Sequence, residues 1–246
     1  MLRSLIKSAL RPFRPGIEAA RRGVLGLPAV GAVDFGSLRG TAPISRKFGV
    51  DRGVPVDRFY IERFLAARAE SIRGQVLEIG EDTYTRRFGG QRVTGSDVLH
   101  VTGDNPAATI VADLANAPHI ADGRFDSIVL TQTLQLIFDP PAALRTLHRI
   151  LKPGGELLVT VPGISPVATG SVWGPTWYWS FTEASLRRLL AARFDERHCH
   201  LETHGNVLAA VAFLEGLAVE DLTLEELTSA DPDYPVVITA LARKTS

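Results

Sequence analysis

Apolar positions divide the chain into a basic N-terminal part and a longer region in which strands and helices alternate. Strands are predicted where short runs are almost wholly apolar, at 75–79, 91–97, 109–114, 126–130 and 156–161. Helices are predicted from apolar faces at 57–70, 140–151, 182–192 and 207–217, followed by a last strand at 234–242. Buried strands separated by helices are typical of a doubly wound α/β fold, and its ligands bind beyond the carboxyl ends of the strands.

The N-terminal part differs in charge from the rest. Residues 1–24 hold six Lys and Arg residues but a single acid, Glu18, with apolar residues at near-helical spacing at Leu2, Leu5, Ile6, Leu10 and Phe13. Such a basic amphipathic arm could dock on an anionic membrane or a partner, or could lie as a solvated helix on its own domain. Residues 30–56 are rich in Gly, Pro and Ser and predict a linker. We therefore divide the chain into an arm with linker, 1–56, and a domain, 57–246.

Composition narrows the partners and the compartment. The 246 residues contain 27 Lys and Arg and 27 Asp and Glu, so no overall charge favours nucleic acid. The single cysteine, Cys199, excludes an intrachain disulfide and fits a reducing compartment. No uninterrupted apolar run is long enough to span a bilayer. These features predict a cytoplasmic protein, with peripheral membrane contact through the arm as an alternative.

The segment VLEIGEDTYTRRFGG, residues 76–90, has the form of a nucleotide-binding loop that has lost glycines. Only Gly80 remains, and Asp82 and Tyr84 stand where fuller loops carry glycine, so a pyrophosphate would be poorly accommodated. Glu78 at the end of the first strand suits a cationic ligand. Asp97, near the predicted end of the second strand, has the spacing of a carboxylate that binds ribose hydroxyls. The pattern indicates a nucleoside that carries positive charge, with Asp82 able to replace glycine by adopting a positive φ.

The chain resembles class I S-adenosylmethionine-dependent methyltransferases over residues 57–195. The matching pieces are VLEIG at 76–80, RVTGSD at 92–97, IVADL at 110–114, FDSIVLTQTLQLI at 125–137, LHRILKPGGELLVTVP at 147–162 and WYWSFTEASLRRLL at 177–190. The resemblance implies a Rossmann-like seven-stranded sheet, mostly parallel, with an antiparallel last strand. It also implies that S-adenosylmethionine is the cofactor.

Site residues carry over at the matching positions. The resemblance gives Glu78 and Gly80 to the methionine part of the cofactor and Asp97 to the ribose, with Asp104 as the natural alternative. It also gives roles to four residues on later strands: Asp113 and Leu114 along the adenine, and Thr131 and Gln132 beside the sulfonium. Asp113 could instead cap the next helix.

The acceptor side is predicted from aromatic residues after the fifth strand. Trp173, Tyr178 and Trp179 form either a wall for a planar or sugar-like acceptor or an apolar plug over the sheet. His100 is the candidate general base, although alignment of acceptor and methyl group can suffice without a base. His198 and His200 lack accompanying carboxylates, so we predict no metal site.

The sequence therefore predicts a methyltransferase that modifies a small-molecule or glycan-like acceptor, with oxygen as the expected acceptor atom. The alternative is a catalytically degenerate protein that keeps the fold for binding or scaffolding. No nucleic-acid partner is expected, and the oligomeric state is left open.

Overall fold

The computed structural model describes residues 23–171 and 174–245. It divides the chain into a first unit, Met1–Ala42, and a second, Pro43–Ser246, which contains all the strands of the described residues. In the first unit, the described side chains are mostly exposed, and η2 (Gly36–Leu38) is a short 3-10 turn. The predicted basic arm lies outside the described residues except for its last two positions.

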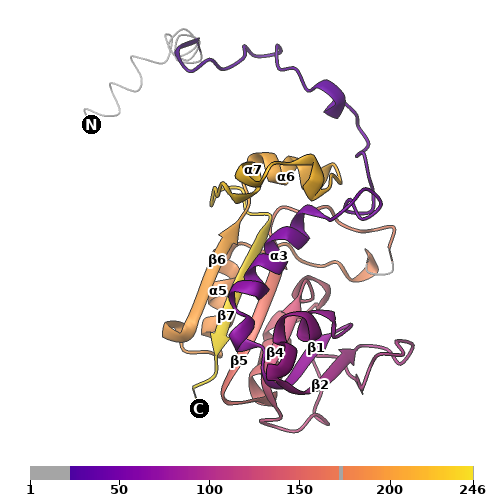
Figure 1. Cartoon of the computed structure of the whole chain (residues 1–246), viewed down its shortest axis with the longest axis vertical. Helices are drawn as coiled ribbons and strands as arrows, with labels where there is room; N and C mark the ends of the chain where they lie inside the picture. The colour runs from indigo at the N-terminus through magenta and orange to yellow at the C-terminus, as the bar shows by residue number, and fades with distance from the viewer. Residues whose placement is uncertain (1–22, 172–173, 246) are drawn as a thin grey trace, which may run out of the picture. The chain divides into compact units, whose positions relative to one another are not determined.

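The second unit is built on one seven-stranded sheet (Figure 1). Its strands are β1 (Gly74–Ile79), β2 (Val93–His100), β3 (Ile110–Val111), β4 (Phe125–Thr131), β5 (Leu151–Pro162), β6 (Cys199–His204) and β7 (Val237–Arg243). They lie side by side in the order β3-β2-β1-β4-β5-β7-β6. The first five pair in parallel, whereas β7 pairs antiparallel with both β5 and β6. The predicted fold class, with its antiparallel last strand, is confirmed.

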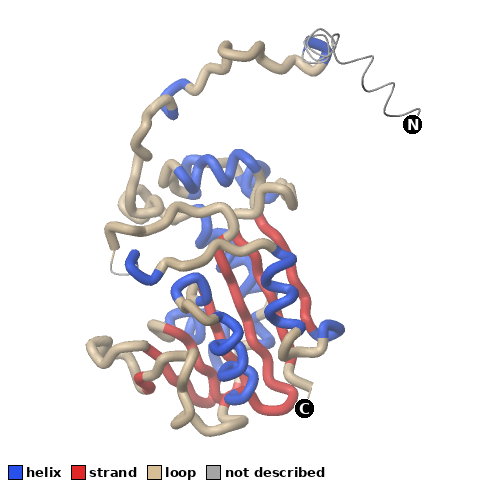
Figure 2. Tube along the Cα trace, turned by 180° about the vertical axis from the view of Figure 1, so that it is seen from behind, coloured by secondary structure: helices blue, strands red, loops and turns tan. Residues whose placement is uncertain are grey.

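Helices cover both faces of this sheet (Figure 2). They are α3 (Val56–Ala67), α4 (Pro140–Ile150), α5 (Glu183–Ala191), α6 (Val207–Leu214) and α7 (Leu224–Thr228). Side chains of α4 and α5 pack on one face, and those of α3 and α6 pack on the other. The helix starts follow from capping residues: Asp139 accepts the Ala142 N–H, and Thr182 forms a capping box with Ser185.

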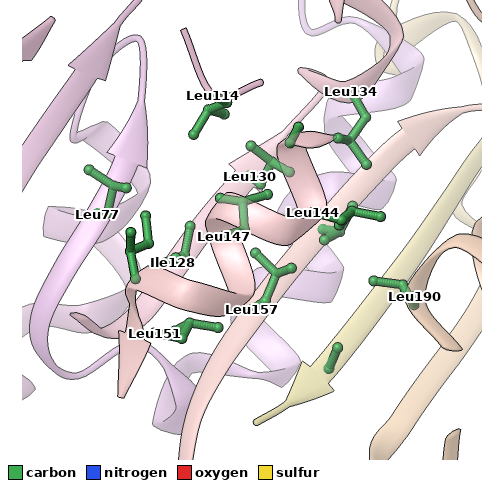
Figure 3. Packing of buried hydrophobic residues seen from close by; sticks show 14 of the residues in the cluster. Leu77, Leu114, Ile128, Leu130, Leu134, Leu144, Leu147, Leu151, Leu157 and Leu190 are labelled. Atoms are coloured by element: carbon green, nitrogen blue, oxygen red, sulfur yellow. The ribbon is translucent and has the colours of Figure 1, made fainter. Parts of the chain in front are cut away.

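Successive side chains of the central strands point to opposite faces of the sheet, so the core lies on both faces. Leu157 of β5 packs with Leu144 and Leu147 of α4, in the cluster drawn in Figure 3, whereas its neighbour Leu158 packs in the cluster that contains Leu65 of α3. Successive strand side chains point to opposite faces, so a strand that is apolar at every position needs cover on both. This two-sided burial fixes the sheet and presents the carboxyl ends of β1, β2, β4 and β5 at one edge.

Two predicted boundaries differ from the structure. Strand β2 continues to His100 rather than ending at Asp97, because Val98 and Leu99 pair with Glu78 and Ile79 of β1. The folded unit begins at Pro43 rather than at 57, since the Ser45 N–H donates to the Glu215 carbonyl at 3.0 Å. Part of the predicted linker therefore belongs to the domain.

Candidate functional site

Gly80 follows β1 directly and opens the loop of residues 80–84 at the carboxyl edge. Its φ of 88° lies in the left-handed region, and a Cβ added there would meet nothing within 4 Å. The backbone on either side is fixed, because the Gly80 N–H donates to the Leu99 carbonyl at 2.9 Å and Asn105 donates to the Gly80 carbonyl at 2.6 Å. Gly80 thus presents bare, well-positioned backbone beside open space.

Glu78 organises this loop from below. Its buried carboxylate accepts the backbone N–H groups of Tyr84 at 3.2 Å and Thr85 at 2.7 Å, at the start of a helical turn that leads into η4 (Thr85–Gly89). Burial raises the pKa of the Glu78 carboxyl, and the hydrogen bonds from Thr85 and Tyr84 act against that rise. Both oxygens therefore have backbone partners, and the predicted contact of Glu78 with the methionine part of a cofactor stays a prediction.

The hypothesis that Asp82 replaces a glycine by positive φ is wrong. Within the described residues, only Phe48 and Gln132 among the non-glycine residues have positive φ. The Asp82 carboxylate instead pairs with Arg86 at 2.7 Å, one helical turn ahead, and its carbonyl accepts the Arg86 N–H. The chain enters a helical turn here, so the left-handed position is not needed.

Asp97 lies inside β2, not at its end. The side chain is 11% exposed and receives three donors, from Arg124 at 2.6 Å, Gln75 at 2.9 Å and Thr109 at 2.7 Å. The hydrogen-bonding capacity of this carboxylate is therefore largely used by donors from the neighbouring segments of the fold. Asp97 thus lies three residues before the end of β2 with its carboxylate engaged by the fold, and its contact with a ribose stays a prediction.

His100 is the residue that ends β2, and Asp104 follows it in the next loop. The Nδ1 atom of His100 lies 3.0 Å from the Thr102 hydroxyl and 3.7 Å from an Asp104 oxygen. The hydrogen bond from Thr102 lowers the pKa of the exposed Asp104 carboxyl. These polar side chains stand where the sequence analysis had expected Asp97, and His100 and Asp104 lie on the β2 side of the edge.

Asp113 and Leu114 follow β3. Asp113 accepts the Ala115 N–H at 2.8 Å and forms an isolated bridge with Asn116, so its carboxylate shapes a turn rather than a helix start. Leu114 is buried in the core cluster, where Figure 3 shows it near the edge of the packed side chains. Only the backbone of Leu114 is left for the predicted adenine contact, because its side chain packs inward.

Thr131 and Gln132 stand at the end of β4, as predicted. Gln132 has a φ of 45°, which is costly for a residue with a side chain, and its N–H donates to the Thr160 carbonyl at 2.9 Å. Its carbonyl accepts a hydrogen bond from the buried side-chain NH2 of Gln135 at 2.7 Å, while the side-chain Oε1 atom of Gln135 has no partner in the described part of the chain. Backbone strain next to an unpaired buried acceptor is typical of a ligand-binding edge.

Sequence reasoning missed the first turn of α3. Asp57 has an enclosed Oδ1 atom with no hydrogen-bond partner among residues 23–171 and 174–245, and burial raises the pKa of its carboxyl. Next to it, the Arg58 guanidinium donates to the hydroxyl of Tyr84 in the loop after β1. The acid–base pair in VDRFY at 56–60 was the signal available in the sequence, but only the fold brings it against this loop.

An exposed aromatic cluster lies on the other side of the edge, beyond β4 and β5. Phe138 packs edge-on against Tyr178 with ring centroids 5.3 Å apart, and Trp179 lies 6.3 Å from Phe138. The Trp179 indole N–H donates to the Ile137 carbonyl at 3.0 Å, which fixes that ring. Phe138 is 72% exposed, and Tyr178 and Trp179 are also exposed, so these rings do not form a buried plug. Trp173 lies outside the described residues.

The electrostatics of the edge favour a cation. Arg58 interacts with Asp57 and Glu81, and Glu81 in turn interacts with Glu78. An unpaired buried carboxylate oxygen is stabilised by a positive ligand group, because burial otherwise penalises its charge. Among the described residues, no group of three or more His, Cys, Asp or Glu side chains could hold a metal ion.

Comparison with known proteins agrees with this architecture. A family model described as a methyltransferase domain matches residues 32–211. The ubiquinone/menaquinone biosynthesis C-methyltransferase UbiE of Haemophilus ducreyi is 47% identical over 47 residues, which is 18% of each chain. UbiE of Klebsiella pneumoniae subsp. pneumoniae is 42% identical over 57 residues, 22% of this chain and 23% of that protein. The matches thus span about a fifth of the length of these relatives.

Among solved structures, the [4+2]-cyclase SpnF aligns over 93% of both chains, with a TM-score of 0.51 and 16% sequence identity. Identity at this level shows a shared fold and nothing about the reaction.

Proposed function

The chain belongs to the methyltransferase-domain family, and on that basis we propose that it is an S-adenosylmethionine-dependent methyltransferase. Two observations carry the proposal: the Gly80 backbone has a positive φ beside open space, and the enclosed Oδ1 atom of Asp57 has no hydrogen-bond partner among the described residues. A ligand with an amino group and a sulfonium would fit both. Asp57 interacts electrostatically with Tyr84 of the loop that Gly80 opens, at the edge where such sheets bind ligands.

Named residues of the chain would hold the cofactor. Asp57 would accept from its ammonium group, and Arg58, once displaced from Tyr84, would pair with its carboxylate. Gly80 would let the backbone approach closely, while His100 and Asp104 would take the ribose at the end of β2. Gln132 and Gln135 would lie toward the reacting end, where the Gln135 Oε1 atom lacks a partner.

Bound S-adenosylmethionine supplies an activated methyl group on a sulfonium, so the chain has to align two reactants rather than form a covalent intermediate. The aromatic cluster of Phe138, Tyr178 and Trp179 would hold the acceptor. Exposed rings bind planar molecules by stacking and sugar rings by their apolar faces, which supports a small-molecule or glycan-like acceptor. Positioning of this kind can account for a large part of a rate enhancement.

Oxygen is the acceptor atom that we propose, and the curated UbiE relatives, named C-methyltransferases, make carbon the competing possibility. His100 is a poor candidate for the base that an oxygen acceptor would need. The end of β2 is separated from β4 by β1, which amounts to about 10 Å across the sheet. The geometry therefore supports His100 on the cofactor side, with proton removal left to another group or to water.

A non-catalytic binding protein is the second candidate, and Tyr84 is the observation that favours it. Tyr84 is 5% exposed, hydrogen-bonded to Arg58, and stands at a loop position where a nucleotide-binding loop would carry glycine. If the Tyr84 ring fills the cofactor site permanently, the protein would keep the methyltransferase fold but could not bind the cofactor or catalyse methyl transfer.

Calorimetric titration of the full chain with S-adenosylmethionine and with its demethylated product distinguishes the two candidates. If the protein is a methyltransferase, we expect saturable binding of both ligands. We also expect Asp57→Asn to weaken the binding of both. Absence of binding in the unmodified chain would support the scaffold. Incubation of candidate acceptors with methyl-labelled cofactor, followed by mass spectrometry of the product, would then identify the modified atom.

We also propose that the protein works in the cytoplasm and that its N-terminal arm can contact an anionic membrane or a partner. The support is the charge pattern of residues 1–24. No helix in the described part of the chain is long and apolar enough to cross a membrane. Sedimentation of the full chain with anionic vesicles at low salt tests the membrane contact, and a protein that never pelleted would exclude it.

A further inference from the structure

Helix α6 carries an apolar face that the described residues of the second unit leave partly exposed. Val207, Leu208, Val211 and Leu214 are between 38% and 53% exposed, and they recur at the spacing of a single helix face. The opposite side of α6 is buried through Ala209, Ala212 and Phe213, so the helix is held firmly by the domain. The exposed residues thus form a fixed apolar stripe, not a frayed end.

The segment that contains this stripe is acidic in sequence. Between residues 205 and 242 the sequence contains seven Asp and Glu residues and no Lys or Arg. Some of these acids hold the fold: Asp221 pairs with Arg52 at 3.0 Å, and Glu226 caps α7. In contrast, the carboxylates of Glu225 and Asp233 have no hydrogen-bond or ion-pair partner among the described residues. We call the apolar stripe and its acids, residues 206–233, the acidic cap.

We propose that the acidic cap binds a cationic amphipathic helix of a partner protein. The apolar stripe fits the apolar face of a helix laid against α6, and the acids of the segment, above all the unpaired Glu225 and Asp233, attract Lys and Arg on the flanks of that helix. A two-fold dimer through this surface would set the acids of one copy against the same acids of the other. An anionic bilayer would meet the same repulsion. Charge therefore selects a basic partner over both alternatives.

The cap stands at the edge that holds the candidate site. Strand β6 ends at His204, which pairs with Val237, and Val237 also pairs with Pro162 at the end of β5. The partner would consequently arrive on the side of the aromatic cluster, and the cap also adjoins the start of α3, because Ala218 forms a bridge with Pro55. This proposal is independent of the methyl-transfer reaction, because it uses none of the residues assigned to the cofactor or the acceptor.

A designed peptide of about 18 residues, in which leucines at helical spacing alternate with lysines, is the probe. The labelled peptide is titrated with the full chain, and fluorescence anisotropy measures the affinity. A peptide of the same pattern with glutamate in place of lysine is the control. We expect the lysine peptide to bind, more weakly as salt increases, and the glutamate peptide not to bind.

Two double variants separate the apolar and the electrostatic parts. Val211→Ser with Leu214→Ser removes half of the stripe, and Glu225→Lys with Asp233→Lys reverses two acids that make no structural contact. Each is expected to weaken binding of the lysine peptide about tenfold. Val111→Ser, at an exposed aliphatic residue of β3, is the matched control and should leave binding unchanged.

Circular dichroism establishes that each variant is folded. Equal affinity for both peptides, absence of binding, or binding that neither double variant alters would overturn the proposal. Sedimentation with anionic vesicles that is lost in the Val211→Ser and Leu214→Ser variant would assign the stripe to lipid instead. Dimerisation of the full chain that the same variant abolishes would assign it to a second copy.

Discussion

Two glycines at the ends of one strand show how differently the two edges of the sheet are built. Gly74 begins β1 and Gly80 follows its end, and both have positive φ, of 67° and 88°. A Cβ on Gly74 would lie 2.4 Å from an oxygen of Asp126, whereas one on Gly80 would meet nothing within 4 Å. The first glycine is required by packing inside the fold, and the second stands beside space that the fold leaves open.

The surroundings of the two glycines differ in the same way. At the amino edge, Asp126 is held by Lys152 at 2.7 Å and by the Gln75 N–H at 2.8 Å, and the Ser127 hydroxyl donates to the Ser71 carbonyl. At the carboxyl edge, the buried oxygens Asp57 Oδ1 and Gln135 Oε1 have no partner within the residues that the structure describes. Polar groups that are complete at one edge and incomplete at the other indicate which edge awaits a ligand.

Gly74→Ala should give the largest effect, because it combines a left-handed backbone with a steric overlap. We expect the free energy of unfolding to fall by about 3 kcal/mol, with cofactor affinity unchanged in the protein that remains folded. Urea denaturation and calorimetric titration provide the two measurements. Gly80→Ala is the matched variant, and we expect it to weaken cofactor binding with a smaller loss of stability. If both variants lost stability equally and bound cofactor equally, the contrast between the edges would fail.

Asp57→Asn should separate binding from stability. We expect the affinity for S-adenosylmethionine to fall about 30-fold, near 2 kcal/mol, because a charged acceptor for the ammonium group would be lost. The unfolding free energy at neutral pH should stay the same or increase, because an unpaired buried charge is removed. Titration and urea denaturation of the same preparation measure both, and unchanged affinity would exclude Asp57 from the site.

The same variant makes a prediction about pH. Burial raises the pKa of the Asp57 carboxyl above its ordinary value of 3.8, so the folded protein holds this proton more tightly than the unfolded chain does. The contribution of Asp57 to stability is therefore fully favourable below pH 3.8 and is lost as pH rises through the raised value. Subtracting the pH profile of Asp57→Asn from that of the unmodified chain should reveal this loss. A difference that increased with pH would contradict the assignment.

Asp97→Ala tests whether a satisfied carboxylate is only structural. Loss of its three donors should lower the unfolding free energy by about 1–2 kcal/mol, toward the low end because Arg124 is partly exposed. The affinity for S-adenosylmethionine should not change. Asp104→Ala is the comparison, and we expect the opposite pattern. Weakened binding with intact stability in Asp97→Ala would restore the ribose role to this residue.

Asp82→Gly and Asp82→Val should give the smallest effects. The Asp82–Arg86 pair is one helical turn apart on the surface, where such pairs contribute about 0.3–0.5 kcal/mol. Because Asp82 does not need positive φ, glycine should bring no gain in cofactor affinity. The two dissociation constants should agree with each other within about twofold. Tighter binding by the glycine variant alone would reinstate a glycine-like role for Asp82.

Prediction from sequence succeeded where one local property decided the structure. Four of the five residues 157–161 are apolar and they occupy both faces of the strand, which specifies a central strand, and Thr182 has the residue type of a helix cap. It failed at Asp97, because the end of β2 depends on how far β1 offers pairing partners. It also failed at Asp57, whose neighbours in space come from a loop more than twenty residues away. Contacts between distant segments leave no periodic signal.

The sequence by itself determined the class of fold and the parallel direction of the first strands, because strand and helix periods are local properties of the chain. It also determined the glycine at the end of β1, because few other residues adopt a positive φ. It also determined the acidity of residues 205–242. Only the tertiary structure decided which carboxylates have donors and which do not, since hydrogen-bond partners such as Arg124 for Asp97 are brought in from other strands. The candidate site is defined by that difference, because an unpaired buried group can be identified only after every possible partner has been placed.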